Sequence, residues 1–498
     1  MPELTQKESA LLERVDAWLA AHRDEYVADL LDWVAIPSVS DASQARAGKP
    51  FGEAVHTVLE RALERAEELG FSTERHDGYA VSVLFGDGRE EIGLASHLDV
   101  VPAGENWEFS PYEPFERDGF VIGRGSSDNK GAAVADLYLL RLLRDLDIPL
   151  HHAVRVIYGG AEETGMADLA YYAENAPVPK ISIVTDGAFP VNFAQKGGLN
   201  VDLFLPAGPV LSAFSAGVAK NAVPATAEIE LPDAQAEALR DAIALLPAEL
   251  AATLEVRRGQ HPVLAARGQS GHAAFPEGTS NAILLLATAL STPAVAAAAG
   301  LEAADVIAAT AIASILQTPY GDGAGTARED DVSGRLTQNG GLVRPVAGGL
   351  LLHLDIRYPV TASHTEILAE LEGATGEFGG HVAHIDHAAP FYIARDNPIV
   401  ELLQSSFDTV LGTTSEPYAM GGGTHSRVLP NAITFGPGFG RISGITADGG
   451  EPRRPDFIKA ENGTPHGPDE FASIENVFAA VRIYVIALTR LDAHLADE

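Results

Sequence analysis

The chain has 498 residues, more than one hydrophobic core usually supports, so we expect two compact units. Its 69 acidic against 34 basic side chains give a formal net charge of -35, which repels phosphate backbones and anionic lipid headgroups. Nucleic acid and membrane partners are therefore not expected. The sequence has no cysteine, so disulfides and thiolate ligands are excluded, and any metal ion must be held by His, Asp and Glu.

Helical and strand patterns alternate along the first part of the chain. Apolar residues at helical spacing predict helices over about 8–36 and 52–69, and Gly70 ends the second. The charged N-terminal segment has no apolar stretch long enough for a signal or transmembrane segment, so we expect a cytoplasmic protein. Apolar runs at 80–86, 92–97, 153–160 and 181–187, separated by helical stretches such as 131–142, predict an α/β fold.

The pattern changes after about residue 199. Alternating LNVDLFL, an Ala-rich helical span over about 282–316, Gly- and Asp-rich loops and the run GLLLHLDIRYPV predict an α+β domain inserted over 199–387. A further helix, the turn-rich segment GGGTHSR and an amphipathic helix from about 470 to 492 then return to the first domain. We therefore expect a discontinuous α/β domain over 1–198 and 388–498, with a central mixed sheet flanked by helices.

Polar residues follow the predicted strands, where open α/β sheets gather their reactive groups. In SHLDVVP at 96–102, His97 could bind a metal ion while Asp99 accepts a hydrogen bond from the other ring nitrogen. Alone, this pair is more typical of a capped turn or a core histidine. In GRGSSDNKG at 123–131, Asp128 precedes an apolar helix, so it could cap that helix or bridge two cations.

The segment GGAEETG at 159–165 places Glu162 and Glu163 side by side after a buried strand. Like charges there repel unless one binds a metal ion or a proton, so one could coordinate while the other acts as a general base. A solvent-facing acidic turn is the alternative. Asp186 in TDG ends another strand, and His466 lies in the turn PHGPDE before the last helix.

Together these side chains are the hard donors that paired zinc, manganese or cobalt ions take. The ordered series SHLDVVP, GRGSSDNKG, GGAEETG, TDG and PHGPDE resembles the co-catalytic zinc peptidase family that includes aminoacylase, glutamate carboxypeptidase, carnosinase and bacterial dipeptidase V. The resemblance extends over most of the chain. It implies a dinuclear, metal-dependent peptidase with a catalytic domain and an inserted lid domain.

The resemblance also implies a role for each motif. Asp99 would orient His97, and Glu162 would be the general base for the attacking water. The bond between Asp128 and Asn129 would be cis. The cofactors would be two zinc ions, with manganese or cobalt as alternatives. One ion would be held by His97, Asp128 and Asp186, and the other by Asp128, Glu163 and His466.

Residues of the inserted domain would contact the substrate. By resemblance, His272 would donate a hydrogen bond to the oxyanion, and Asn221 and Arg357 would grip the carboxylate of a short peptide. Read without the family, Asn221 is a turn residue and Arg357 a surface strand residue. Backbone N–H groups of GGGTHSR, at Gly422, Gly423 and Thr424, could approach the substrate, and a plain loop is equally compatible with the pattern.

The insertion over 199–387 resembles the enlarged lid of the dipeptidase V branch, which favours a monomer whose substrate is two residues long. His425 departs from that branch, where an aromatic residue is usual, and this puts the second substrate pocket in doubt. The cluster His381, His384, Asp386 and His387 mimics a metal site, but it falls outside the family's motifs and is expected to lie on an exposed strand.

The leading hypothesis is a metal-dependent dipeptidase acting on small peptides. The alternatives with the same chemistry are an N-acyl amino acid deacylase or a carboxypeptidase of the same family, including succinyl-diaminopimelate desuccinylase. An inactive binding protein on the same scaffold is a more remote alternative, because every metal ligand and Glu162 are present. The sequence does not separate the dipeptidase from the deacylase.

Overall fold

The computed structural model describes residues 3–88, 90–440, 444–447 and 453–497, which form two compact units. The first unit comprises Met1–Phe193, Ile393–Tyr418 and Thr424–Glu498, and the second comprises Ala194–Tyr392 and Ala419–Gly423. The second unit is therefore inserted into the sequence of the first. Each unit has its own hydrophobic core.

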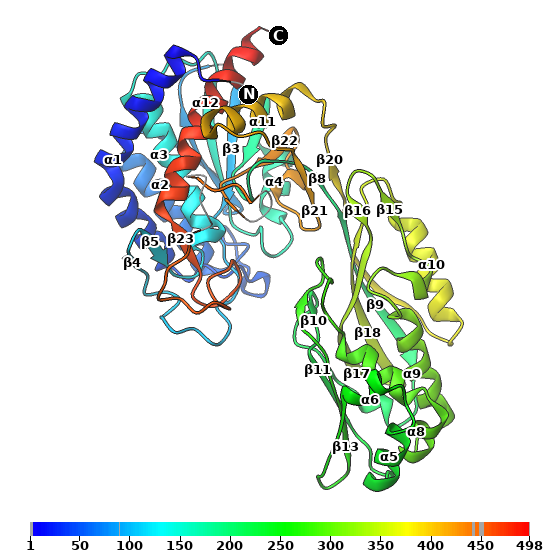
Figure 1. Cartoon of the computed structure of the whole chain (residues 1–498). Helices are drawn as coiled ribbons and strands as arrows, with labels where there is room; N and C mark the ends of the chain where they lie inside the picture. Colours follow the sequence, from blue (N-terminus) through cyan, green and yellow to red (C-terminus); the bar gives the residue numbers. More distant parts are fainter. Residues whose placement is uncertain (1–2, 89, 441–443, 448–452, 498) are drawn as a thin grey trace. The chain divides into compact units, whose positions relative to one another are not determined.

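Helices and strands alternate in the first unit (Figure 1). Its helices are α1 (Gln6–Val34), α2 (Glu53–Glu68), α3 (Gly131–Asp145), α4 (Ala167–Asn175), α11 (Pro398–Leu411) and α12 (Ile474–Ala496). Its strands are β1 (Ser72–His76), β2 (Ala80–Phe85), β3 (Glu91–His97), β4 (Phe115–Arg117), β5 (Phe120–Ile122), β6 (Ala153–Gly159), β7 (Ile181–Val184), β8 (Val191–Gln195), β21 (Tyr418–Met420), β22 (Ala432–Phe435) and β23 (Phe471–Ser473).

Local signals explain several element boundaries. A capping box between Thr5 and Glu8 begins α1, and Gly70, at a φ of 84°, follows the end of α2 as predicted. The final helix begins at Ile474 rather than near 470, because Phe471–Ser473 pair with β5 as a strand. The Ser473 side chain then caps α12.

A mixed sheet runs through the first unit in the order β1-β2-β6-β3-β7-β22-β8 and continues to β20 (Phe391–Tyr392), with β21 also paired to β8. Side chains of β6 alternate between two cores. Val154 and Val156 pack in the core that includes α1, α3 and α12, whereas Ile157 packs with residues of α4 on the other face. Helices therefore cover both faces, and the predicted α/β class is confirmed.

The sheet topology brings the predicted site residues to one edge. β3 is parallel to both β6 and β7, so the carboxyl ends of these strands lie together. His97 is the last residue of β3, Glu162 and Glu163 follow β6, and Asp186 follows β7. The inner strands β3, β6 and β7 are buried along almost their whole length.

The second unit is an α+β unit. Its helices are α5 (Ala236–Ile243), α6 (Ala248–Ala252), α7 (Ala282–Leu290), α8 (Pro293–Ala298), α9 (Ala303–Ile315) and α10 (His364–Gly376). Its strands, besides β20, are β9 (Gly197–Pro206), β10 (Ala222–Val223), β11 (Thr226–Glu230), β12 (Leu254–Arg257), β13 (Val263–Arg267), β14 (Gly271–His272), β15 (Glu329–Asp330), β16 (Gly334–Arg335), β17 (Thr337–Val346), β18 (Gly349–Tyr358) and β19 (His381–Ala388). The main antiparallel sheet has the order β17-β18-β9-β19.

The Ala-rich span predicted as helical over 282–316 consists of α7, α8 and α9 rather than one continuous helix. Ser291 ends α7 as its C-cap, and Pro293 starts α8 at its first helical position, where proline is tolerated. Gly300, at a φ of 70°, then ends α8.

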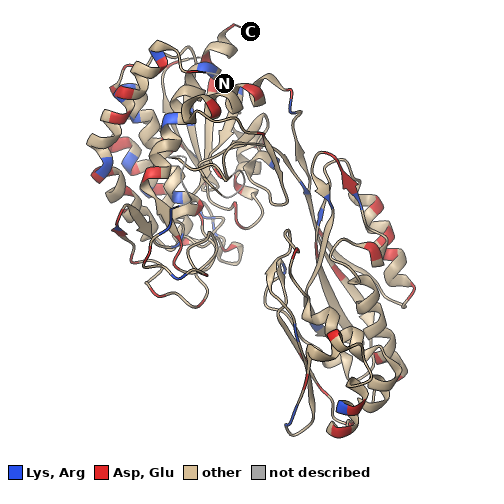
Figure 2. Ribbon diagram, viewed as in Figure 1, with Lys and Arg blue, Asp and Glu red and all other residues tan. Residues whose placement is uncertain are grey.

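Acidic residues lie on helices of both units (Figure 2). This distribution is that of a solvated acidic surface. Among the described residues, none of the helices has both the length and the apolar character that crossing a bilayer requires.

Candidate metal centre

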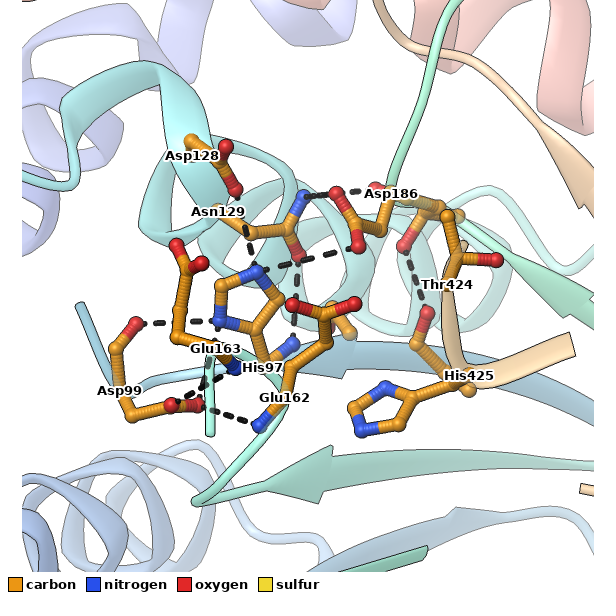
Figure 3. A network of polar contacts seen from close by, with 12 residues as sticks. His97, Asp99, Asp128, Asn129, Glu162, Glu163, Asp186, Thr424 and His425 are labelled. Atoms are coloured by element: carbon orange, nitrogen blue, oxygen red, sulfur yellow. Dashed lines mark hydrogen bonds and ion pairs between the residues drawn. The ribbon is translucent and has the colours of Figure 1, made fainter. Parts of the chain in front are cut away.

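The candidate centre lies at the carboxyl ends of β3, β6 and β7 and in the turn before α3 (Figure 3). His97 is buried, at 1% exposure, and its two ring nitrogens face different partners. The Nδ1 atom lies 3.0 Å from the backbone oxygen of Asp99 and 3.3 Å from its carboxylate. This contact directs Nε2 toward Asp128, whose Oδ1 atom is 3.1 Å away.

Asp128 lies between two imidazoles. Its Oδ1 atom faces His97 Nε2, and its Oδ2 atom lies 3.2 Å from Nε2 of His466. The bond from Asp128 to Asn129 is cis. No side chain caps α3, so the helix-cap explanation of Asp128 is wrong. A carboxylate that turns each oxygen to a different imidazole has the arrangement of a bridging ligand.

The loop that carries Asp128 is held by Glu470. This fully buried carboxylate accepts hydrogen bonds from the backbone N–H groups of Gly125, Ser127 and Asp128, at 3.0, 2.9 and 2.9 Å. Arg124, also buried, donates to it at 2.6 Å. Because a buried charge is costly unless it is paired and hydrogen-bonded, this network gives the loop a defined conformation.

Besides its contact with His97, the Asp99 carboxylate also accepts hydrogen bonds from the acidic turn after β6. Its Oδ1 atom accepts the backbone N–H of Glu162 and its Oδ2 atom that of Glu163, both at 3.1 Å. One buried carboxylate therefore connects the end of β3 to the acidic turn after β6. The neighbouring N–H in that turn, from Ala161, donates to Asp168 at 2.8 Å.

His466, in a turn with a φ of 62°, completes the cluster. Its Nε2 atom lies 3.1 Å from Oε1 of Glu163 as well as 3.2 Å from Asp128. About half of the His466 side chain is exposed, so the cluster is open to solvent on this side. Hydrogen bonds to Asp128 and Glu163 raise the pKa of His466 to about 11.

The pKa values of Glu162, Glu163 and Asp186 are raised, because these acidic groups are buried close to one another. Burial raises the pKa of Glu163 to about 7 and that of Asp186 to about 6, and the charge of Asp128 adds to both shifts. Burial and the charge of Asp186 raise the pKa of Glu162 well above its ordinary value. Carboxylates that repel one another in a partly buried place provide the counter-charge that divalent cations require.

Two overlapping sets of side chains in the described part of the chain place their donor atoms close enough to hold a cation. One set is His97, Asp128 and Glu163, and the other is His97, Glu162 and Asp186. The second set includes Glu162, which the sequence predicts as a general base rather than a ligand. His466 is in neither set. Its Nε2 atom nevertheless lies 3.2 Å from Asp128 and 3.1 Å from Glu163, a spacing at which the three side chains could share a cation.

Strand β19, which carries His381, His384, Asp386 and His387, is exposed along nearly all of its length. Its residues are absent from the candidate metal sets found among the described residues. Both observations agree with the sequence interpretation of an exposed strand.

The predicted substrate residues of the inserted domain lie in the second unit. His272 Nδ1 accepts the N–H of Ala274 at 3.1 Å, which puts the ring hydrogen on Nε2. Asn221 is exposed and lies in a turn directly before β10, and its backbone oxygen accepts the N–H of Ala273 at 2.9 Å. Arg357 is held by both carboxylate oxygens of Asp355, at 2.7 and 2.8 Å.

The segment GGGTHSR crosses from one unit to the other. Gly422 and Gly423 belong to the second unit and Thr424 to the first. The Thr424 hydroxyl lies 2.6 Å from Thr434 Oγ1 and accepts the N–H of Ser426 at 3.3 Å, so it anchors the segment within the first unit. The structure therefore assigns the Thr424 side chain a structural contact.

Sequence reasoning missed four buried groups that support the centre: Arg124, Asp136, Asp168 and Glu470. Glu470 lies within the motif PHGPDE, and its place directly before an apolar helix was the available signal. Asp136 and Asp168 lie in helical segments whose pattern carries no sign of a buried carboxylate. Their partners are known only once the strands are assembled.

The strand ends of the first unit gather imidazoles and carboxylates, and an α+β unit interrupts the sequence of this α/β unit. Such a group of side chains offers donors for divalent cations. The chain belongs to Peptidase family M20/M25/M40, which it matches over residues 93–490. The resemblance noted from its motifs is thereby confirmed at the level of the family.

Two curated relatives show how much of the chain the similarity covers. "Putative dipeptidase YtjP" of Bacillus subtilis (strain 168) is 30% identical, over 94% of this chain and 97% of the relative. "Beta-Ala-Xaa dipeptidase" of Lactobacillus delbrueckii subsp. lactis is 27% identical, over 95% of this chain and 97% of the relative. The chain therefore matches both relatives over nearly their whole length.

Solved structures share the fold. The dipeptidase Dug1p from Saccharomyces cerevisiae has a TM-score of 0.57 at 10% identity, covering 98% of this chain and 99% of that one. Human carnosine dipeptidase 1 has a TM-score of 0.53 at 14% identity, covering 97% of this chain and 100% of that one. At this identity the likeness concerns the arrangement of the chain alone.

Proposed function

We propose that this protein is a zinc-dependent dipeptidase that hydrolyses the amide bond of dipeptides, with two metal ions and Glu162 as the general base. The observation that carries the proposal is the position of Asp128, whose two oxygens face His97 and His466 at 3.1 and 3.2 Å. Manganese and cobalt are the alternative metals. The expectations of a monomer and of a cytoplasmic location stay predictions.

The donor set fits two divalent cations. We assign His97, Asp128 and Asp186 to one ion and Asp128, Glu163 and His466 to the other. Tetrahedral zinc with bonds of about 2.0–2.2 Å sets neighbouring donors roughly 3.3–3.6 Å apart. The distances from Asp128 to His97, from Asp128 to His466 and from Glu163 to His466 all lie between 3.1 and 3.2 Å.

Glu162 is assigned to proton transfer instead of coordination. When bound, the two ions would polarise the scissile carbonyl and make a water more acidic. Burial and neighbouring negative charge raise the pKa of Glu162, which suits a carboxylate that takes a proton from water and passes it to the leaving amine. Asp99 supports this task, because it holds the backbone of Glu162 at 3.1 Å.

The second unit is proposed to be the lid that supplies the substrate contacts. His272 would donate from Nε2 to the oxyanion, which agrees with the acceptor role of its Nδ1. Asn221 and Arg357 would bind the substrate carboxylate. Asp355 orients the Arg357 guanidinium by a two-point contact, which limits its rotation. Backbone N–H groups at Gly422, Gly423 and Thr424 are proposed as further contacts.

The names of the relatives favour a dipeptidase over the other activities of the family. Both curated relatives carry that name and match this chain almost end to end. An N-acyl amino acid deacylase or a carboxypeptidase, including succinyl-diaminopimelate desuccinylase, is the second candidate because the same centre can cleave their amide bonds. An inactive binding protein is the remote alternative.

The test is a substrate panel run on purified protein loaded separately with zinc, manganese and cobalt. We expect cleavage of dipeptides, including β-alanyl and His-containing ones, and at most weak cleavage of tripeptides and N-acyl amino acids. Cleavage of acylated amino acids alone would replace the dipeptidase by the deacylase. Absence of hydrolysis with every metal and every substrate would support the binding protein.

A further inference from the structure

Asp136 is a fully buried carboxylic acid that the proposed chemistry does not use. It lies on α3, where the residues around it, Leu137, Leu139 and Leu140, are buried and apolar. A carboxyl group in such surroundings costs stability that an apolar residue of the same size would not. Buried polar groups that cost stability in this way are often found at functional sites.

One oxygen of Asp136 joins two strands of the sheet. Its Oδ2 atom accepts a hydrogen bond from Ser96 Oγ at 2.9 Å and another from Thr185 Oγ1 at 2.6 Å. Its Oδ1 atom has no hydrogen-bond partner among the described residues. In the described part of the chain, this carboxylate therefore makes hydrogen bonds to these two hydroxyl groups alone.

Both hydroxyl groups lie directly before a proposed ligand of the same metal ion. Ser96 precedes His97 at the end of β3, and Thr185 precedes Asp186 after β7. Neighbouring side chains of an extended chain point to opposite sides, so holding Ser96 and Thr185 on the α3 side turns His97 and Asp186 toward the centre.

The third ligand of that ion is connected to Asp136 through the chain. Helix α3 starts at Gly131, three residues after Asp128, and carries Asp136 in its second turn. Asn129 adds a parallel link, because its side chain accepts the N–H of His97 at 3.3 Å and donates to the backbone oxygen of Thr185 at 2.9 Å. All three ligand segments therefore converge on α3 and the turn before it.

Groups other than Asp136 hold Glu163 and His466, the two ligands that we assign to the other ion alone. Asp99 holds the backbone of Glu163 at 3.1 Å, and Arg124 donates to the backbone oxygen of His466 at 3.2 Å. Among the described residues, Asp136 makes no hydrogen bond to either segment, and the N–H of Asp128, which both ions share, is held by Glu470 at 2.9 Å. A change at Asp136 is therefore expected to act on one half of the centre.

We propose that Asp136 is a positioning residue that sets the spacing of His97 and Asp186, the two ligands that we assign to one ion alone, and so determines the affinity of that metal position. This inference rests on the proposed function, since it takes the ligand assignment from there. Groups just behind metal ligands commonly change metal affinity by about 10- to 100-fold when they are removed.

The experiment measures cobalt binding to the full-length protein by titration calorimetry and by metal analysis after dialysis. Wild type is expected to bind two cobalt ions. Asp136→Leu, which keeps the branched shape but removes both acceptors, is expected to bind one ion normally and the other about tenfold or more weakly. Asp136→Asn keeps one acceptor oxygen for the two hydroxyl groups and is expected to restore most of the lost affinity.

A second variant, His466→Ala, identifies which of the two metal positions is weakened. His466→Ala removes a ligand of the other ion only, so the remaining cobalt ion should depend on Asp136. Adding Asp136→Leu to His466→Ala is expected to weaken that binding by about tenfold or more, as in the single variant. If Asp136→Leu does not fold, Ser96→Ala and Thr185→Val remove the two donors singly, and each is expected to weaken the same position.

Asp305 provides a matched control. It is fully buried, and its carboxylate accepts the backbone N–H of Leu211 at 2.8 Å in the second unit. Asp305→Leu should leave cobalt binding unchanged. Normal binding of both ions by Asp136→Leu, or equal weakening of both, would overturn the inference. Failure of wild type to bind cobalt would instead contradict the proposed function.

Discussion

The Nε2 atom of His425 lies 3.1 Å from each carboxylate oxygen of Asp168, and both side chains are fully buried. Asp168 in turn accepts the N–H of Ala161, the residue before Glu162. The pair therefore links the segment after Gly423 to the acidic turn. His425 stands where an aromatic residue is usual in the branch that this sequence resembles, so the chain carries a hydrogen-bonding residue at this point.

His425→Phe is expected to lower kcat about tenfold while KM changes little. The phenyl ring retains most of the volume, but Asp168 loses its partner, and breaking a buried pair costs about 3–5 kcal/mol. The acidic turn should then be less well fixed beside the metal ligands. Steady-state kinetics and urea unfolding measure the two effects.

Asp168→Asn is the companion variant, because its amide oxygen still accepts the N–H of Ala161. We expect it to lose less activity than His425→Phe. Unchanged kcat and stability in His425→Phe would show that the pair has no part in holding the turn.

Glu162→Gln is expected to keep both metal ions and to lose activity by about 10²- to 10⁴-fold, the usual contribution of a general base. Glutamine has nearly the same size but does not take up a proton. Metal analysis and kcat measure the outcome. Glu174→Gln, on an exposed position of α4, is the control and should retain full activity. Loss of one metal ion from Glu162→Gln would instead identify Glu162 as a ligand.

Glu470→Gln is expected to weaken both metal positions, in contrast to the selective effect at Asp136. Glu470 holds the backbone of Asp128, which we assign to both ions, and its charge is paired with Arg124 at 2.6 Å. Removing that charge leaves a buried guanidinium unpaired, at a cost of roughly 3–5 kcal/mol. Cobalt titration and thermal unfolding test this, and a loss confined to one ion would contradict it.

Asp136 is expected to give the metal-free protein a distinct pH dependence. Burial raises its pKa from 3.8 to about 7, against the opposing hydrogen bonds of Thr185 and Ser96. The folded state thus binds this proton more tightly than the unfolded state does. Its contribution to stability is fully present below about pH 4 and is lost as the pH rises through about 7, at up to about 1.4 kcal/mol per pH unit.

The measurement compares the unfolding free energies of wild type and Asp136→Asn between about pH 4 and 8, both with chelator. The difference between the two curves should fall as the pH rises, because the other titrating groups are common to both proteins. Parallel curves would show that Asp136 does not take up a proton in this range.

Much of the centre was accessible from the sequence because its chemistry lies where predicted strands end. His97, the two glutamates and Asp186 follow apolar runs whose pattern is local, and the strands β3, β6 and β7 lie where those runs predict them. The sequence pattern around Asp128 does not show whether this residue caps the following helix or bridges two cations. A helix cap and a bridging carboxylate need the same residue type in the same place, and only the structure excludes the cap.

The helical span expected over about 282–316 shows a similar limit. Alanine favours helix throughout that span, and the breaks at Ser291 and Gly300 depend on how α7, α8 and α9 pack around the core of the second unit. Helix propensity therefore predicts where the helical region lies, but it does not predict where one helix ends and the next begins.

The sequence by itself determined the α/β class, the order of the ligand motifs and the family, since each depends on residue types and local spacing. The tertiary structure decided which buried groups hold those ligands. Asp136 meets Ser96 across 40 positions, His425 meets Asp168 across 257, and Glu470 meets Asp128 across 342. Hydrogen bonds between such distant residues exist only after the strands and helices have packed, so no local pattern encodes them.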